Sequence, residues 1–367
     1  MVKLMHILTD TGLGGAGVWL LNFLSAYDRE KYNVSVALPE NSVLAERVRK
    51  LSVTVFEVPF IADSSYSKKG TKEFIRLFHR EKPDLVHCHA SLSARIAAKR
   101  CGIPVVNTRH CLEKPLNFPK RELYGLLNNA LSDIVIGVSE KTCENLAECG
   151  TKKSKIRLVY NGVRPVRRIT DDEKASLRAR YGVPPENTVV GLVARLEPVK
   201  NPFLFLEGAK IILAYKQDVT FLIVGGGSLE GELHRSAKEM GISENIVFAG
   251  QLDDISGALG IMDIITLTSE KEALSISLIE GMSIGLPAVS TDSGGPNEVI
   301  EDGVTGKITE NGNAEAFADA VVYYLSSPTA RLRDGKAGEK RAREKFGLDT
   351  MVSELDKIYA EILKKGK

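Results

Sequence analysis

The sequence has no long hydrophobic run, because no stretch of about eighteen apolar residues occurs in its 367 residues. It also lacks the pattern of a secretory signal, and residues 1–8 fit a first buried strand instead. Cysteine is scarce: the chain has five, an odd number, without the spacing of zinc ligands. These absences predict a soluble, cytoplasmic chain with free thiols in a reducing compartment.

Two further absences concern metal-binding and nucleic-acid-binding motifs. No Asp-x-Asp triplet occurs, so the commonest sequence signature of a carboxylate-held divalent cation is missing. Aromatic residues make up only 6% of the chain and no nucleic-acid recognition motif is present. The second absence leads us to expect no nucleic-acid partner.

Charge is unevenly distributed along the chain. Residues 1–170 carry 27 basic and 16 acidic side chains, whereas residues 171–367 carry 22 basic and 31 acidic ones. A basic first half joined to an acidic second half suggests that the first half meets an anionic partner. The alternative is that this uneven distribution of charge arose without any partner.

Short β-rich runs alternate with helical stretches throughout, which is typical of parallel sheets covered by helices. The expected strands are residues 5–9, 33–38, 54–58, 85–89, 105–108, 134–138, 156–159, 189–193, 220–224, 246–249, 264–268, 288–290 and 307–309. The expected helices include residues 17–27, 43–50, 69–81, 91–100, 120–131, 202–215, 229–240, 255–262, 275–284 and 314–326. We predict an α/β fold with two doubly wound domains, residues 1–168 and 169–349, whose ligand-binding edges face a central cleft. A helix at about 350–367 is expected to pack back on the first domain.

Glycines and cations follow two of the expected strands. Gly12-Leu13-Gly14-Gly15-Ala16-Gly17 lies between the first strand and the first helix, where free amides at a helix N-terminus suit a phosphate. A plain tight turn is the alternative. Arg195 and Lys200 lie in the loop after residues 189–193 and could clamp a diphosphate, unless this loop is simply solvated.

Two later segments contain, respectively, three consecutive glycines and a pair of glutamate residues. The glycines at 225–227 end a buried strand and would let a flat base or ribose lie against the backbone, unless they form a turn without a ligand. Glu272 lies in a loop and Glu280 lies on the next helix, with seven residues between them. Amides at 273–276 open that helix and could meet phosphate oxygens. Among apolar neighbours the carboxylate of Glu280 needs partners such as ribose hydroxyls, unless Glu280 lies on the helix surface.

Together these segments resemble the family-4 retaining glycosyltransferases of the GT-B fold (glycosyl transferases group 1), which consists of two Rossmann-like domains. The resemblance also rests on the runs Gly285-Leu286-Pro287-Ala288-Val289, Gly294-Gly295-Pro296-Asn297-Glu298 and Asp302-Gly303-Val304-Thr305-Gly306. Gly14-Gly15, His89, His110, Ser139 and Asn161-Gly162-Val163 also stand at characteristic positions. It extends over nearly the whole chain and is most specific between residues 190 and 306.

The resemblance implies roles for the matching residues. Arg195 and Lys200 would neutralise the donor diphosphate and stabilise the departing nucleotide, and Glu280 would hold the ribose hydroxyls. The other implied contacts are Gly225, Gly226 and Gly227 at the base and ribose, backbone near Leu252 at the base edge, Glu272 with the amides of Ala273, Leu274, Ser275 and Ile276 at the donor sugar, and Gly15 and Ala16 at the diphosphate. His110 matches an active-site histidine near donor sugar and acceptor, although a lone loop histidine is more often structural or exposed.

The implied activity is the transfer of a hexose or N-acetylhexosamine with retention, without cofactor or metal. Arg195, Lys200 and a helix N-terminus would replace the cation, in agreement with the missing Asp-x-Asp signature. The leaving phosphate would help to deprotonate the acceptor on the same face of the sugar. UDP is the expected nucleotide, with GDP open. Gly17, where the family commonly has Glu, and Ala273, where Gly often follows the Glu, depart from the pattern and bear on sugar specificity.

Basic amphipathic helices at 67–82 and 118–131 could lie on an anionic membrane, or could be ordinary domain surface. With the basic first half, they favour a lipid-linked saccharide acceptor at the inner membrane face, in cell-envelope polysaccharide or lipopolysaccharide synthesis. Two competing functions are a nucleotide-sugar epimerase of the same fold and a catalytically silent binding or regulatory subunit. The Glu272/Glu280 pattern argues against the first, and the presence of Arg195, Lys200 and Glu280 argues against the second.

Overall fold

The computed structural model describes residues 1–113 and 117–365, and it divides into two compact units. The first comprises Met1–Gly162 together with Gly347–Lys367, and the second comprises Val163–Phe346. Each unit is built on a parallel β-sheet with helices on its faces, which confirms the predicted α/β fold class.

The first unit has a seven-stranded sheet in the order β3-β2-β1-β4-β5-β6-β7. Its strands are β1 (Val2–Ile7), β2 (Tyr32–Pro39), β3 (Thr54–Val58), β4 (Leu85–His89), β5 (Val105–Arg109), β6 (Ile134–Gly137) and β7 (Ile156–Leu158). Its helices are α1 (Gly15–Leu24), α2 (Leu44–Lys50), α3 (Lys68–Glu81), α4 (Leu92–Arg100), α5 (Lys120–Leu131), α6 (Glu140–Glu148) and α15 (Leu348–Lys365). The strand order reverses between β1 and β4, so the loops that follow these strands diverge to opposite faces.

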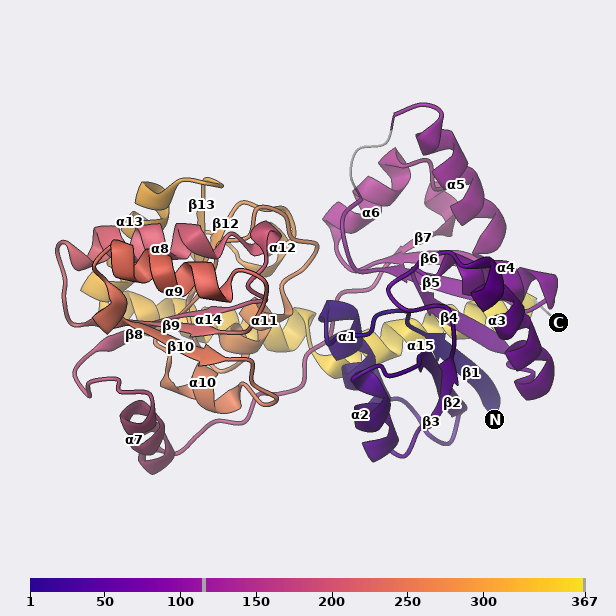
Figure 1. Cartoon of the computed structure of the whole chain (residues 1–367), viewed down its shortest axis with the longest axis horizontal. Helices are drawn as coiled ribbons and strands as arrows, with labels where there is room; N and C mark the ends of the chain where they lie inside the picture. Colours follow the sequence, from indigo (N-terminus) through magenta and orange to yellow (C-terminus); the bar gives the residue numbers. More distant parts are fainter. Residues whose placement is uncertain (114–116, 366–367) are drawn as a thin grey trace. The chain divides into compact units, whose positions relative to one another are not determined.

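The C-terminal helix α15 completes the core of the first unit, and Figure 1 shows it in yellow against the N-terminal strands. Leu355 and Tyr359 on this helix are fully buried, in one cluster with Trp19 and Phe23 of α1. The Tyr359 hydroxyl lies 2.6 Å from Nδ1 of His87 on β4. The last helix of the chain is therefore an integral layer of the unit that the first strand begins.

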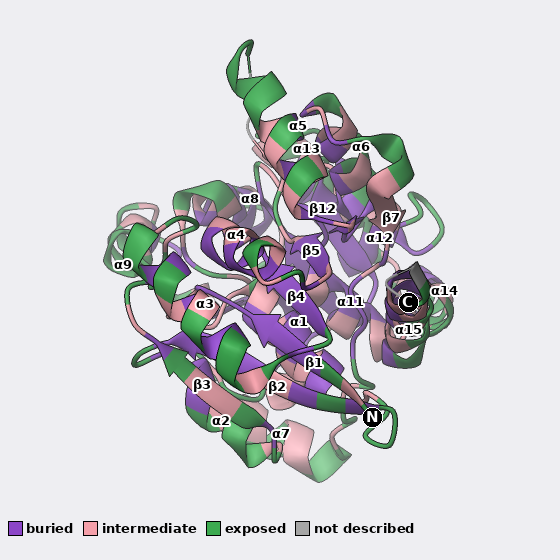
Figure 2. Cartoon of the chain, turned by 90° about the vertical axis from the view of Figure 1, so that its right-hand side faces the viewer, coloured by how far each residue is buried: buried purple, intermediate pink, exposed green. Residues whose placement is uncertain are grey.

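The second unit has a six-stranded sheet in the order β10-β9-β8-β11-β12-β13. Its strands are β8 (Thr188–Val193), β9 (Val219–Val224), β10 (Ile246–Gly250), β11 (Ile264–Leu267), β12 (Ala288–Thr291) and β13 (Gly306–Thr309). Its helices are α7 (Asp171–Arg180), α8 (Pro202–Leu213), α9 (Glu230–Glu239), α10 (Ser256–Ile261), α11 (Ile276–Ser283), α12 (Pro296–Val299), α13 (Ala314–Ser326) and α14 (Pro328–Lys345). Buried strands run through the interior of each unit, whereas most helices have an exposed face (Figure 2).

Helix α7 is absent from the expected helices, because its own residues carry no apolar periodicity and none of them is buried. Its start is nevertheless encoded. The Thr170 hydroxyl accepts a hydrogen bond from the Glu173 amide, and the Glu173 carboxylate accepts one from the Thr170 amide. This capping box fixes the start of α7 and explains why a polar segment is helical.

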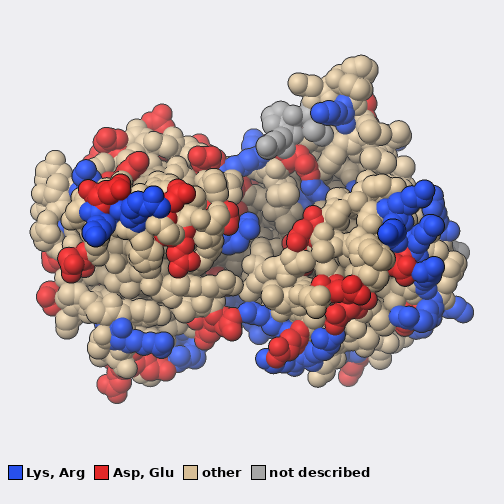
Figure 3. All heavy atoms as spheres, in the orientation of Figure 1, with Lys and Arg blue, Asp and Glu red and all other residues tan. Residues whose placement is uncertain are grey.

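Lys and Arg side chains gather on the surface of the first unit around α3 (Figures 1 and 3). The apolar residues Phe74, Leu77 and Phe78 of α3 are buried in the core, so this helix presents only its basic side to solvent. In the described part of the chain, no helix combines the length and the apolar character that crossing a bilayer requires.

Candidate functional site

The predicted donor-site residues of the second unit follow neighbouring strands. Leu252 comes after β10, the glycines 225–227 come after β9, Arg195 and Lys200 come after β8, and Glu272 comes after β11. These four strands are consecutive in the sheet and parallel. Because parallel strands end at the same edge, the residues form one row along the carboxyl edge of the sheet, where ligands bind in doubly wound folds.

The glycine turn packs against the loop that carries Arg195. A Cβ on Gly225, whose φ is +137°, would lie 1.9 Å from the carbonyl oxygen of Ala194, and one on Gly227 would lie 2.4 Å from that of Leu196. The Leu196 amide donates to the Gly226 carbonyl at 3.0 Å. A Cβ on Gly226 would make only ordinary contacts with Glu230 and Gln251, the nearest at 3.7 Å. Packing therefore requires glycine at two of the three positions and tolerates a Cβ at the third.

Arg195 and Lys200 differ in their surroundings. The Arg195 side chain is exposed, and no described residue forms a hydrogen bond or ion pair with it. Lys200 forms an ion pair with the Glu272 carboxylate, and both side chains are largely buried, at 17% and 13% exposure. The structure thus brings together two predicted site residues, one after β8 and one after β11, as oppositely charged neighbours.

Backbone contacts hold Glu272 in place. Its amide donates to the Ser293 carbonyl at 2.9 Å, and its carbonyl accepts from the Gly295 amide at 2.9 Å. A Cβ on Gly295 would lie 2.1 Å from the Ala273 carbonyl oxygen, so only glycine allows this approach. The segment Gly294-Gly295-Pro296 therefore acts as a support for the Glu272 loop, a relation that sequence spacing alone could not reveal.

The amides of Ala273, Leu274, Ser275 and Ile276 lead into α11. Ser275 caps this helix by accepting a hydrogen bond from the Leu278 amide at 3.3 Å. Among the described residues, no backbone carbonyl outside the helix accepts a hydrogen bond from these four N–H groups. Unpaired N–H groups at a helix start, beside the Lys200–Glu272 pair, form an environment that favours anionic oxygens.

Glu280 lies on α11 between buried Ile279 and Gly281. No described residue donates a hydrogen bond to its carboxylate or forms an ion pair with it. Burial raises the pKa of Glu280 to about 7, because an ionised carboxylate loses its hydration there. The Glu280 side chain is half-buried, next to the buried residues of α11. An unpaired carboxylate in such surroundings is a feature more often kept for a ligand than for stability.

The glycine-rich segment of the first unit lies at the start of α1. Gly15 is its first residue, Gly14 provides no side-chain cap, and a Cβ on either would meet no atom within 4 Å. Gly17 differs, since a Cβ there would lie 3.1 Å from both methyl groups of Leu44 on α2. A larger residue at Gly17 would require the Leu44 side chain to shift, while Gly14, Gly15 and half-exposed Ala16 leave the helix start open.

His110 directly follows β5 and belongs to a network of buried imidazoles. Its Nε2 atom lies 2.8 Å from Nδ1 of His89, whose Nε2 lies 3.2 Å from Nδ1 of His6. Burial lowers the pKa of His110 and of His6 to about 3, so both rings are neutral at physiological pH. The isolated loop histidine of the sequence is therefore the outer member of a chain of rings. Residue spacing gives no signal for this row of rings, because its members lie on β1, on β4 and just after β5.

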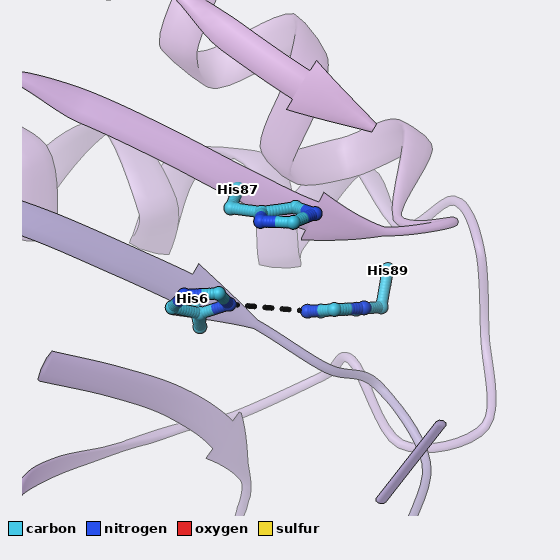
Figure 4. A group of neighbouring side chains, drawn as sticks. All are labelled: His6, His87 and His89. Carbon is cyan, nitrogen blue, oxygen red and sulfur yellow. Dashed lines mark hydrogen bonds between the residues drawn. The ribbon is translucent and has the colours of Figure 1, made fainter. Parts of the chain in front are cut away.

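Figure 4 shows His6, His87 and His89, the group of potential metal ligands in the described part of the chain. Their geometry does not suit an ion. The rings of His87 and His89 are stacked, with centroids 4.7 Å apart and planes 16° apart, so their in-plane lone pairs do not converge. His87 uses both nitrogens for Tyr359 and Thr108, and His6 and His89 face each other across a hydrogen bond. His6 and His89 are thus hydrogen-bonded to each other, and His87 stacks beside them with its own partners.

Comparison with known families agrees with this geometry. The family model for glycosyl transferases group 1 matches residues 173–341, and that for glycosyltransferase family 4 matches residues 13–167. The two matches together span most of both units. The chain therefore belongs to the family-4 glycosyltransferases of the GT-B fold, and it is a transferase, as the sequence resemblance predicted.

Individual relatives are distant. N-acetyl-alpha-D-glucosaminyl L-malate synthase of Bacillus anthracis is 25% identical over 324 residues, which cover 86% of this chain and 84% of the relative. UDP-Gal:alpha-D-GlcNAc-diphosphoundecaprenol alpha-1,3-galactosyltransferase of Escherichia coli is 26% identical, over 99% of this chain and 97% of the relative. The crystal structure of Anabaena Alr3699/HepE with UDP and glucose superposes with a TM-score of 0.88 at 20% identity, covering 98% of this chain and 100% of that chain. This last similarity confirms the fold.

Proposed function

We propose that the chain transfers a hexose or N-acetylhexosamine, with retention and without a metal ion, from a UDP-sugar to a lipid-linked saccharide acceptor in cell-envelope polysaccharide or lipopolysaccharide synthesis. The observation that carries the donor half of this proposal is the half-buried Glu280 carboxylate, which has no hydrogen-bond or ion-pair partner among the described residues and lies on α11, the helix that follows the Glu272 loop. Ribose hydroxyls would donate the hydrogen bonds that this carboxylate lacks.

The diphosphate would lie beside Glu280, at the carboxyl edge of the second sheet. Exposed Arg195 supplies a planar fork of donors, Lys200 supplies a compact charge, and the N–H groups of residues 273–276 supply an electropositive helix start. These groups stabilise negative charge on a departing nucleotide, which is what a divalent cation does in metal-dependent transferases. The leaving phosphate would then accept the acceptor proton on the same face of the sugar.

Lys200 is held by Glu272 in the free chain. A bound diphosphate would compete for the Lys200 ammonium, and Glu272 would become free to accept hydrogen bonds from the donor-sugar hydroxyls. The ion pair would thus hold the Lys200 and Glu272 side chains in place until the substrate binds. UDP is supported by the names of the Escherichia coli relative and of the Anabaena structure.

The proposed acceptor rests on the surface of the first unit and on the name of the Escherichia coli relative. Phe118, Leu123 and Leu126, in and just before α5, are 83%, 58% and 64% exposed. They are flanked by the exposed cations Lys120 and Arg121. Apolar side chains among cations suit the headgroup region of an anionic membrane, and the exposed lysines of α3 would add electrostatic attraction.

The transfer reaction tests this proposal. The full chain is incubated with each UDP-hexose or UDP-N-acetylhexosamine and a polyprenyl-diphosphate-linked N-acetylglucosamine, with a chelator present throughout. We expect release of UDP that depends on the acceptor, and a product that keeps the α configuration of the donor. Arg195→Ala should abolish turnover, whereas Arg180→Ala, an exposed arginine on α7, should not.

Other outcomes would contradict specific parts. A β-linked product would refute retention, and turnover only after addition of a divalent metal would refute metal independence. Conversion of the UDP-sugar without an acceptor would indicate an epimerase. Binding of UDP without any turnover would indicate a silent subunit.

Membrane contact has its own test, flotation with vesicles of phosphatidylglycerol and phosphatidylethanolamine. We expect the wild-type chain to float at low salt and the triple variant Phe118→Ser, Leu123→Ser, Leu126→Ser to remain at the bottom. Leu332→Ser is the matched control, because Leu332 is equally exposed, at 76%, on α14. Absence of flotation for the wild type would refute a membrane-surface acceptor.

A further inference from the structure

Lys200 is the last residue of a single 3₁₀ turn, Pro198–Lys200, in the loop between β8 and α8. Within this turn the Lys200 amide donates to the Glu197 carbonyl at 2.9 Å. The next residue, Asn201, has a φ of +43°, in the left-handed region that residues other than glycine seldom adopt. Because one 3₁₀ turn followed by a strained residue is weak in isolation, the place of this turn depends on contacts with other parts of the unit.

The loop after β11 supplies such contacts. The Thr268 hydroxyl donates to the Lys200 carbonyl at 3.1 Å, and the Glu270 amide donates to the Val199 carbonyl at 2.9 Å. The contact from Glu270 uses a main-chain N–H, which every residue except proline offers. The contact from Thr268 needs a side-chain hydroxyl, and the Thr268 side chain is fully buried. The Thr268 hydroxyl is therefore the part of this link that depends on the amino-acid sequence.

A second threonine of the same segment forms a matching contact away from the candidate site. The Thr266 hydroxyl, on β11, donates to the Gly191 carbonyl on β8 at 2.9 Å, and Thr266 is also fully buried. Both hydroxyls thus join the β11 segment to the β8 segment, and the two should contribute similarly to stability. They differ in the residue that they hold, since Gly191 lies within a strand whereas Lys200 carries the cation that pairs with Glu272.

We propose that Thr268 is a positioning residue for Lys200: its hydroxyl fixes the Lys200 carbonyl, and thereby the point from which the Lys200 side chain reaches the diphosphate of a nucleotide sugar. The contact between Lys200 and a diphosphate rests on the proposed function, whereas the tether is a property of the free chain.

The tether gains importance when the substrate binds. In the free chain the Glu272 carboxylate holds the Lys200 ammonium directly, but a diphosphate competes for that ammonium. The lysine side chain is a flexible four-carbon stem, so the position of its charge then depends on how firmly its backbone is held. Without the Thr268 hydroxyl, Lys200 keeps its charge but loses part of its effect on the bound diphosphate.

Hydrogen exchange of the full-length free protein tests the tether without any ligand. Thr268→Val keeps the shape of the side chain and removes the hydroxyl, so the amides of Lys200 and Asn201 should lose protection about fivefold, the effect of one hydrogen bond. Thr266→Val is the matched control: it should lower the midpoint of urea unfolding as much as Thr268→Val does, yet leave these two amides protected. Thr268→Ser, which keeps the hydroxyl, should also leave them protected.

Calorimetric titration with UDP and with uridine tests what the tether does for binding. Thr268→Val should bind UDP about five- to tenfold more weakly than wild type and uridine with unchanged affinity, because only UDP carries the diphosphate that Lys200 meets. Thr266→Val and Thr268→Ser should bind both as wild type does. In a Lys200→Ala background, Thr268→Val should cause no further loss of UDP affinity, since the hydroxyl acts through Lys200.

The outcomes separate the inference from the proposed function. Unchanged protection of the Lys200 and Asn201 amides in Thr268→Val, or an equal loss in Thr266→Val, would overturn the inference. Unchanged UDP affinity in Thr268→Val, or a loss of affinity that persists in the Lys200→Ala background, would overturn it as well. A loss of protection confined to Thr268→Val, with no binding of UDP by the wild type, would support the tether and refute the proposed function alone.

Discussion

Glu280 is the side chain whose environment makes the sharpest prediction at the scale of single residues. Its pKa of about 7 in the folded chain exceeds the ordinary value of 4.5, so the folded state holds its proton more tightly than the unfolded state does. Stability is therefore unaffected below pH 4.5 and falls as pH rises toward 7. Glu280→Gln removes the charge that this half-buried position disfavours and should raise the free energy of unfolding at pH 8 by about 2 kcal/mol, with little effect at pH 4.

Urea unfolding across this pH range measures the effect. Glu207→Gln on α8 is the matched control, because Glu207 is exposed and should give a difference near zero at every pH. A Glu280→Gln variant that is less stable than wild type at pH 8 would mean that the carboxylate has a partner in the free protein.

Single residues also show which parts of the candidate site can be predicted from the sequence and which cannot. Arg195, Lys200, Glu272 and Glu280 could be selected from spacing, because loops after parallel strands meet at one sheet edge. Their contacts could not be predicted. The Lys200–Glu272 pair depends on β8 lying next to β11, and the approach of His6 to His89 depends on β1 lying next to β4. Pairings between strands far apart in sequence leave no local signal.

At the scale of elements, the turn after β9 makes a prediction with its own internal control. Gly227→Ala would place a methyl group 2.4 Å from the Leu196 carbonyl oxygen, whereas Gly226→Ala meets nothing within 3.7 Å. We expect Gly227→Ala to lower the free energy of unfolding by about 2 to 3 kcal/mol and Gly226→Ala by less than about 0.5 kcal/mol. Thermal unfolding monitored by circular dichroism compares them, and equal effects would mean that the turn does not pack on the Arg195 loop.

Elements also differ in how well their sequences predict them. Strands such as β9 and helices such as α8 have apolar residues at the spacing of a buried face, and the pattern predicts both. Helix α7 escapes prediction because it buries no side chain, and its capping box is the local signal of its start. The basic helix α3 is the opposite case: its apolar residues pack in the core, and its spacing predicts the helix.

At the scale of the whole molecule, the first unit depends on both ends of the chain. Leu355 on α15 is fully buried in the cluster that contains Leu4 of β1 and Trp19 of α1. Leu355→Ala should lower the free energy of unfolding of this unit by about 2 to 5 kcal/mol, because it leaves a cavity in that core. Leu332→Ala, exposed on α14, should cost less than about 0.5 kcal/mol.

Hydrogen exchange locates the effect of Leu355→Ala. Amides of β1, β2 and β4 should lose protection in the variant, while those of β8 and β9 should keep theirs. Equal loss of protection in both sheets would mean that the two units unfold as one.

The most direct measurement on the whole molecule is calorimetric titration of the full-length chain with UDP at pH 8, in the presence of a chelator. Wild type and Glu207→Gln should bind UDP with the same Kd, whereas Glu280→Gln should bind about 30-fold more weakly, because about 2 kcal/mol of hydrogen bonding to a charged group is lost. Equal affinities for wild type and Glu280→Gln, or no binding of UDP by either, would contradict a nucleotide-sugar site at the carboxyl edge of the second sheet.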